Sequence, residues 1–513
     1  MDFFSPVLDG FGVVFQPANL LYCLLGVTLG MLVGVLPGLG PAATIAVLLP
    51  ITYNIEPTAA IIMLAGIFYG AQYGGTITSV LLRLPGEASS VVTALDGHEM
   101  AKQGRAGAAL GISAIGSFIG GTVAIIALTF AAPLVAGFAL DFGPAEYTML
   151  ALLGILLVST LGTGSVPKSL LMATVGLLLA TVGQDPLVGT ARLSFGIDDL
   201  LDGIDFVIVA MGLFGVGEIL YNLESLRRKS PPPAKIDSVY PSRTDLSESK
   251  GAISRGSLVG FLLGILPGGG ATMSSMVAYA VEKKVTKKPE KFGKGAIQGV
   301  AGPESANNAA ATSSFIPLLS LGIPANATMA VMFGALMLQG ITPGPLLVEE
   351  KPDLFWGVVN SMYIGNLLLL AMSLPLIGLF VRILRIRPAI LAPLTILVTM
   401  IGVYTVRNNV FDMFLVIGLG VLGYLMKKVG FEPGPLVLAF VLGGILESNF
   451  RRSMRTFGGD LGGFLTQPIA ATLLGLIVLV VVVIPALRLA YKLRAKASAP
   501  EPASSTKEKE TRV

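Results

Sequence analysis

Long apolar stretches dominate the chain, and glycine and proline interrupt them more often than charged residues do. An apolar stretch of roughly 17 to 25 residues can cross about 30 Å of hydrocarbon as a helix. The pattern predicts an all-α polytopic integral membrane protein with about 10 to 12 transmembrane helices. In the first half, these stretches lie near residues 20–35, 41–50, 57–82, 107–132, 146–161, 166–183 and 204–222.

One interruption occurs twice. Residues 34–41 have the sequence Gly-Val-Leu-Pro-Gly-Leu-Gly-Pro, and residues 264–270 have Gly-Ile-Leu-Pro-Gly-Gly-Gly. Backbone groups released by such a break must be satisfied within the protein or face a water-filled cavity, because hydrocarbon offers no hydrogen bonds. The pattern therefore predicts broken or re-entrant helices around a transport site, and the alternative is a simple helix kink.

Further matches indicate an internal duplication. Residues 84–86, Leu-Pro-Gly, correspond to Ile-Pro-Ala at 323–325, and residues 182–186 correspond to 429–433. The separation between matching segments grows slowly along the chain, as duplication followed by small insertions would produce. We therefore expect a first transmembrane repeat, a cytoplasmic linker, a second transmembrane repeat and a polar C-terminal tail. Their boundaries are 1–222, 223–250, 251–495 and 496–513.

Loop charges predict that the repeats are inverted. The loop at 51–57 has no lysine or arginine, whereas its counterpart in the second half carries a cluster of lysines. The next loop of the first half is basic, but its counterpart contains Glu349, Glu350 and Asp353. Under the positive-inside rule, equivalent loops then lie on opposite sides of the membrane. The acidic loop is expected on the periplasmic side.

Composition agrees with a membrane protein and narrows the chemistry. Hydrophobic residues make up 53% of the 513 positions and charged residues 13%, and the mean hydropathy is +0.79. Cys23 and His98 are the only cysteine and histidine, so the chain has neither a disulfide framework nor a multi-histidine metal centre. It also lacks a P-loop and a zincin motif. We expect neither an enzyme nor a cofactor.

Two groups of residues are candidates for binding substrate or ions. The breaks would offer backbone amides and carbonyls, and a sodium ion could lie near the backbone of Gly38 and Gly268. Small polar side chains nearby could bind carboxylate oxygens or sodium, or could only join helices. The candidates are Pro37, Gly38, Gly40, Gly74, Gly75, Thr76, Thr78, Ser79, Pro267, Gly268, Gly269, Gly270, Ser305, Asn307, Asn308 and Pro324.

Two acidic residues lie beside prolines close to these polar stretches. Glu87 follows the Leu-Pro-Gly segment, and Glu304 follows Pro303. Each could hold a coupling cation, or could be a carboxylate exposed in a loop. The sequence does not choose between these two interpretations.

At these motifs the chain resembles a known family. The segments at 34–41, 73–79, 84–87, 302–310 and 321–324 are similar to the large membrane subunit of tripartite tricarboxylate transporters, the TctA-like family. The resemblance implies a secondary transporter in the bacterial inner membrane, coupled to sodium or protons. It also implies a carboxylate substrate such as citrate, a periplasmic solute-binding protein and a small membrane subunit. The acidic loop with Glu349, Glu350 and Asp353 is then expected to help dock that binding protein.

One position departs from the expected repeat, because Ala325 stands where Gly86 predicts a glycine. An ion or small-solute channel is the alternative function, since repeated broken helices also build selectivity filters.

Overall fold

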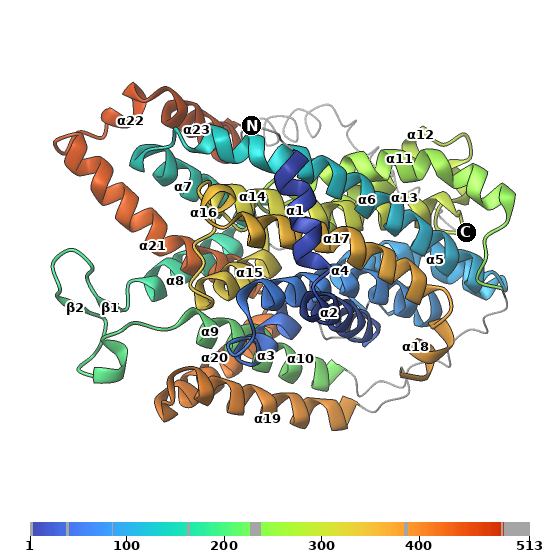
Figure 1. The fold of residues 1–513 in the computed structure, drawn as a ribbon, viewed down its shortest axis with the longest axis horizontal. Coiled ribbons are helices and arrows are strands. Elements are labelled where there is room, and N and C mark those ends of the chain that lie inside the picture. The colour runs from blue at the N-terminus through green and yellow to red at the C-terminus, as the bar shows by residue number, and fades with distance from the viewer. Residues whose placement is uncertain are drawn as a thin grey trace, which may run out of the picture.

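The computed structural model describes residues 4–36, 40–84, 86–161, 165–225, 238–383, 388–483 and 486, and these are almost entirely helical (Figure 1). Seven helices in this part are long and apolar enough to cross a membrane. They are α2 (Pro17–Val35), α4 (Pro57–Leu82), α6 (Ala106–Ala139), the helix Phe206–Glu224, α17 (Pro352–Ser373), α20 (Val410–Lys428) and α21 (Pro433–Thr456).

The number of long helices is lower than the ten to twelve expected from apolar stretches. Seven further apolar helical segments in the described residues have 10–17 residues. These shorter apolar helices are Phe4–Val14 (α1), Pro41–Thr52 (α3), Pro144–Thr160 in α7, Val166–Ala180 (α8), Ala327–Leu338 (α15), Ala392–Thr405 in α19, and Pro468–Val483, which includes α23.

The structure has a helix interruption at each of the two repeated motifs, at the positions predicted from the sequence. Helix α2 ends at Val35 and α3 begins at Pro41, a position that suits proline because the first helical amide needs no partner. In the second half, α11 (Arg243–Ile265) stops before α12 (Gly270–Val285). Gly268 and Gly270 have φ angles of +81° and +53°, a region that favours glycine.

The boundary predicted for the linker is too late in the sequence. Helix α11 begins at Arg243, so the last residues of the expected 223–250 linker are helical. Ser242 and Asp245 form a capping box: the Ser242 hydroxyl accepts the Asp245 amide, and the Asp245 carboxylate accepts the Ser242 amide. This local hydrogen bonding starts the helix before its apolar part. Residues 226–237 of the linker lie outside the described residues.

The two halves use the same close helix packing. In the first half, three glycines of α2 pack against backbone carbonyls of α4, and in the second half three glycines of α11 pack against α13 (Gln298–Ser313) in the same way. A Cβ atom at any of them would lie 2.2–2.5 Å from a carbonyl oxygen. The pairs are Gly26–Met63, Gly30–Ile67, Gly34–Ala71, Gly256–Gly302, Gly260–Ala306 and Gly264–Ala310. This repeated contact supports the duplication.

Helix α4 lies at the centre, with its apolar window fully buried. Near its beginning, the Gln339 amide donates to the Thr52 carbonyl over 2.7 Å. Beyond its other end, Gln103 donates to the Lys294 carbonyl over 2.9 Å. Because α4 has 26 residues, and hence a length of about 39 Å, these two loop contacts lie at opposite ends of the protein. The loop that follows α3 and the lysine-rich loop that follows α12 therefore lie at opposite ends of α4.

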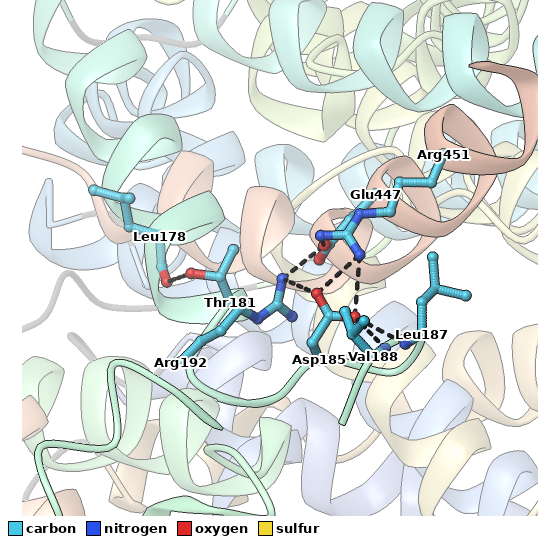
Figure 2. Close-up of polar contacts among 8 residues, drawn as sticks. All are labelled: Leu178, Thr181, Asp185, Leu187, Val188, Arg192, Glu447 and Arg451. Carbon is cyan, nitrogen blue, oxygen red and sulfur yellow. Dashed lines mark hydrogen bonds and ion pairs between the residues drawn. The ribbon is translucent and has the colours of Figure 1, made fainter. Parts of the chain in front are cut away.

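A charged cluster fixes the β1–β2 hairpin (Gly183–Gln184 and Ala191–Arg192) to α21 (Figure 2). Arg451 donates to Asp185 over 2.8 Å and contacts Glu447 over 2.7 Å, while Arg192 donates to Glu447 over 2.6 Å. A hydrogen bond from the Leu187 amide and, to a smaller extent, the contact with Arg451 lower the pKa of Asp185 to about 2. Its carboxylate is therefore charged at neutral pH. Arg451 is therefore a paired charge that joins the hairpin to α21.

The glycine contacts give a direct test of the packing. Gly260→Ala should lower the free energy of unfolding by about 1 to 3 kcal/mol, because the added methyl would push α11 away from the Ala306 carbonyl. Thermal unfolding of the purified protein would measure the effect. Gly418→Ala on α20 is the matched control, because nothing lies within 4 Å of the added methyl there. Equal melting temperatures for the two variants would contradict this account.

Candidate functional site

A cavity of about 510 Å³ joins the two repeated breaks. Gly40 reaches it from the first break, and Gly268, Gly269 and Gly270 reach it from the second. Helix α3 has 12 residues and α12 has 16, so the cavity lies about 18 Å from one end of the protein and about 24 Å from the other. It is therefore near the middle of the membrane-spanning part, where interrupted backbone can serve a binding site.

Four helices begin at this cavity. The residues at the N-termini of α3, α12, α15 and α21 all line it, and each of these helices has at least 12 residues. The first amides of a helix have no partner within the helix, and the helix dipole adds partial positive charge at that end. Their convergence gives the cavity a potential suited to anionic oxygens. Because α3 and α21 begin with proline, which has no N–H, the first amides available as donors come mainly from α12 and α15.

Charged side chains complete the lining. Lys427 of α20 is 2.8 Å from Glu218 of α10 (Gly217–Ser225), and both line the cavity with Glu87 and Glu432. Lys427 also lies over the Tyr221 ring, 5.5 Å from its centre. A single lysine thus faces three carboxylates among the described lining residues. Helix ends therefore have to supply much of the favourable potential for an anion.

The matching Leu-Pro-Gly and Ile-Pro-Ala segments occupy comparable positions beside the cavity. The Gly268 amide donates to the Ala325 carbonyl over 2.8 Å, which links the second break to this segment. A Cβ atom at Gly86 would lie 2.1 Å from the Gly34 carbonyl oxygen.

The residue after each segment caps the next helix and lines the cavity. The Glu87 carboxylate accepts the Ser89 amide over 2.9 Å, and the Asn326 side chain accepts the Met329 amide over 3.0 Å. These contacts hold the two polar side chains at the rim of the same space. Of the two interpretations open for Glu87, the structure favours a half-buried residue in the site over one fully exposed in a loop.

The other predicted site residues are placed differently. Pro37 and Gly38 lie outside the described residues, as does any sodium position built on Gly38. Pro267 and Pro324 flank the cavity without lining it. Gly74 and Gly75 are packing positions on α4, where added methyl groups would lie 2.2 Å from the Met31 carbonyl oxygen and 3.1 Å from Glu87.

Most of the predicted polar side chains are buried in contacts between helices. Thr78 donates to the Val35 carbonyl, Ser79 to Ser90 and Ser305 to the Ala301 carbonyl, each over 2.8 Å. Asn308 donates to Ser117 over 2.7 Å, and Thr76 donates to Glu304 over 2.7 Å. None of these side chains lines the large cavity, so they surround it as a second layer.

Asn307 is an exception within that layer. It is fully buried, and neither atom of its amide has a hydrogen-bond partner among the described residues. Ser275 of α12 reaches the Pro303 carbonyl, and Gly299 faces Tyr279, so α12 and α13 run in opposite directions. One turn beyond Pro303, Asn307 comes level with Ala271, which lines the cavity.

Sequence reasoning missed several lining residues. Glu218, Lys427, Gln72 and Asn326 line the cavity but are not among the predicted site residues. Glu432 and Asn326 could have been found, because Glu432 lies within the segment 429–433 and Asn326 follows the segment 323–325. Lys427 and Glu218 carry no such signal, since only the tertiary packing of α10 against α20 brings them to the cavity.

The predicted docking residues are at the surface. Glu349 and Glu350 end the short helix α16 (Leu347–Glu350), Asp353 lies in the first turn of α17, and all three are exposed. The described part of the chain contains no group of three or more His, Cys, Asp or Glu residues arranged to hold a metal.

Comparison with known proteins adds an independent finding. Residues 20–438 match the tripartite tricarboxylate transporter TctA family. An uncharacterized 52.8 kDa protein in the TAR-I ttuC' 3' region of Agrobacterium vitis is 50% identical over 490 residues, which cover 95% of this chain and 98% of the relative.

An uncharacterized protein in the TAR-II ttuC' 3' region of the same organism is 53% identical over 231 residues, or 45% of this chain and 96% of that relative. No solved structure matches. The match over most of the chain agrees with the apolar helices and the repeated breaks, and the protein therefore belongs to the TctA family of tripartite tricarboxylate transporters.

Proposed function

We propose that the chain is the large permease subunit of a tripartite transporter in the bacterial inner membrane, and that it takes up citrate or a related di- or tricarboxylate. The observation that carries the proposal is the cavity at the two breaks, where four helix N-termini and Lys427 converge. A multiply charged carboxylate that leaves water needs fixed donors of this kind. A soluble binding protein would deliver the substrate, and a small membrane subunit would complete the assembly.

The charge of the cavity supports coupling to a cation gradient. Glu87, Glu218 and Glu432 outnumber Lys427 at the cavity wall. Adding a dianion or trianion there concentrates negative charge in a region of low dielectric constant, unless cations enter with it. We therefore propose symport with sodium. A channel, the alternative, would show unitary conductance instead of saturable, gradient-driven uptake.

Uptake into proteoliposomes tests the substrate site. Labelled citrate and other di- and tricarboxylates would be offered with the binding protein and with varied sodium. Lys427→Gln should raise the apparent KM by about ten-fold or more, because it removes a charge-assisted hydrogen bond to substrate. Lys102→Gln, an exposed lysine paired with Glu99, is the matched control.

A second variant separates two effects of the Lys427 change. Glu218→Gln combined with Lys427→Gln removes the acid that the single variant leaves unpaired. If the lysine binds substrate, the double variant should keep the high KM. Wild-type kinetics in both variants would place the substrate elsewhere.

We also propose that the two halves are inverted in the membrane, with the lysine-rich loop and the 223–250 linker in the cytoplasm. The positions of equivalent loops at opposite ends of α4 support this arrangement. In a Cys23→Ala background, Lys287→Cys should react with impermeant thiol reagents only from the cytoplasmic side, and Tyr53→Cys only from the periplasmic side. Tyr53 is suitable because its side chain is exposed, whereas Thr52 is buried. Reaction of both from one side would rule out the inverted repeat.

The exposed acidic loop is proposed to seat the periplasmic binding protein. Charges at the rim of an interface act mainly on the association rate and make it sensitive to salt. Glu349→Gln, Glu350→Gln and Asp353→Asn together should therefore slow binding-protein-dependent uptake at low salt and flatten its salt dependence. Glu290→Gln in the lysine-rich loop serves as the control. An unchanged association rate at low salt would reject this docking surface.

A further inference from the structure

Glu304 is a buried carboxylate outside the large cavity. It lies on α13 with no exposed surface, in the first turn after Pro303. Within the described part of the chain it forms no ion pair, and every side chain bonded to it is neutral. An uncompensated charge at this depth is costly, and acidic residues inside membrane proteins commonly mark ion pathways.

Hydroxyl groups surround this carboxylate from three helices of the first half. Thr76 of α4 donates to Oε2 over 2.7 Å, and Thr93 of α5 (Thr93–Lys102) donates to Oε1. Ser117 of α6 is 3.5 Å from Oε2, and Ser113 on the same helix lines a small cavity together with Thr76. The set consists only of oxygen atoms, which hard cations prefer. It contains one carboxylate, so one monovalent cation would neutralise it.

A small cavity lies beside this cluster. Its volume is about 10 Å³, and its lining includes the polar residues Tyr73, Thr76, Ser113 and Ser373. Such a volume is roughly that of one water-sized particle. The Tyr73 hydroxyl donates to Asn366, which leaves its oxygen lone pairs available. The space can therefore accept a single small ion next to the Glu304 cluster.

We propose that Glu304, with Thr76, Thr93 and Ser113, binds the sodium ion that is co-transported with the carboxylate. This inference rests on the proposed function and adds the residues of the ion site. Because α13 belongs to the second half and the hydroxyls belong to the first, an ion here joins the two repeats.

The contacts also connect this site to the large cavity. Gln72, one turn before Thr76 on α4, lines the large cavity and accepts the Ser89 hydroxyl over 2.8 Å. Ser89 also donates to Glu87, in the cavity wall, and Thr93 begins the helix that follows. An ion bound by Thr76 and Thr93 therefore also restrains Gln72 and Glu87, which line the large cavity. Binding of the ion and binding of the substrate then stabilise each other.

Thermal unfolding of the purified full chain, without carboxylate, tests the ion site. Sodium chloride should raise the melting temperature of the wild-type protein above that in choline chloride of equal ionic strength. Glu304→Gln should abolish this difference. Thr76→Val should raise the sodium concentration needed for half of the effect by about ten-fold. Glu99→Gln, an acidic residue of α5 away from the cluster, should respond as wild type does.

Several results would overturn the site. The first is a sodium response that is unchanged in Glu304→Gln, and the second is equal stabilisation by sodium and choline. The third is a melting temperature that depends on pH and not on sodium, which would mean that Glu304 binds a proton instead. If Glu304→Gln does not fold, Thr76→Val is the test: an unchanged sodium concentration for half of the stabilisation would reject the site. Carboxylate uptake by wild-type protein that shows no sodium response would remove this site but keep the transport function. A sodium response in a protein that takes up no carboxylate would keep this ion site but remove the proposed transport function.

Discussion

The need to satisfy every backbone hydrogen-bonding group in hydrocarbon governs this structure. Continuous helices meet it internally, but the breaks after Val35 and Ile265 release amides and carbonyls near mid-membrane. In the folded protein, both breaks line one cavity that also contains polar side chains. The same interruption that would destabilise a lipid-facing helix thus becomes the source of binding groups. Four helix N-termini meet there because each chain segment restarts at that point.

Close packing makes this arrangement rigid. Glycines at every fourth position of α2 and α11 allow these helices to touch the backbones of α4 and α13. Around the cavity, hydroxyl and amide side chains then tie α4, α5, α6 and α13 together, with the Glu304 carboxylate at their centre. The polar residues therefore form two layers, an inner one of helix ends and charged groups and an outer one of hydroxyls.

Several features could be read from local sequence. The apolar stretch at 57–82 coincides with α4, because length and hydropathy alone define a helix that neighbours cover on all sides. The breaks were identifiable because Pro37, Pro267 and their glycines recur in matching context. Thr76 and Asn308, predicted to bind carboxylate oxygens or sodium, do not line the large cavity. Sequence cannot tell which side of a fully buried helix faces the cavity, and here both side chains point into contacts between helices.

The sequence by itself determined the membrane class and the positions of the breaks, since each depends on composition or on residues close along the chain, and it predicted a duplication. Only the tertiary structure decided which residues share the cavity. Lys427 and Glu218 are separated by a long stretch of chain, and they meet because α20 packs against α10. Likewise, the hydroxyls around Glu304 come from three different helices of the other half. Such convergence depends on helix packing across the repeats, which no local pattern encodes.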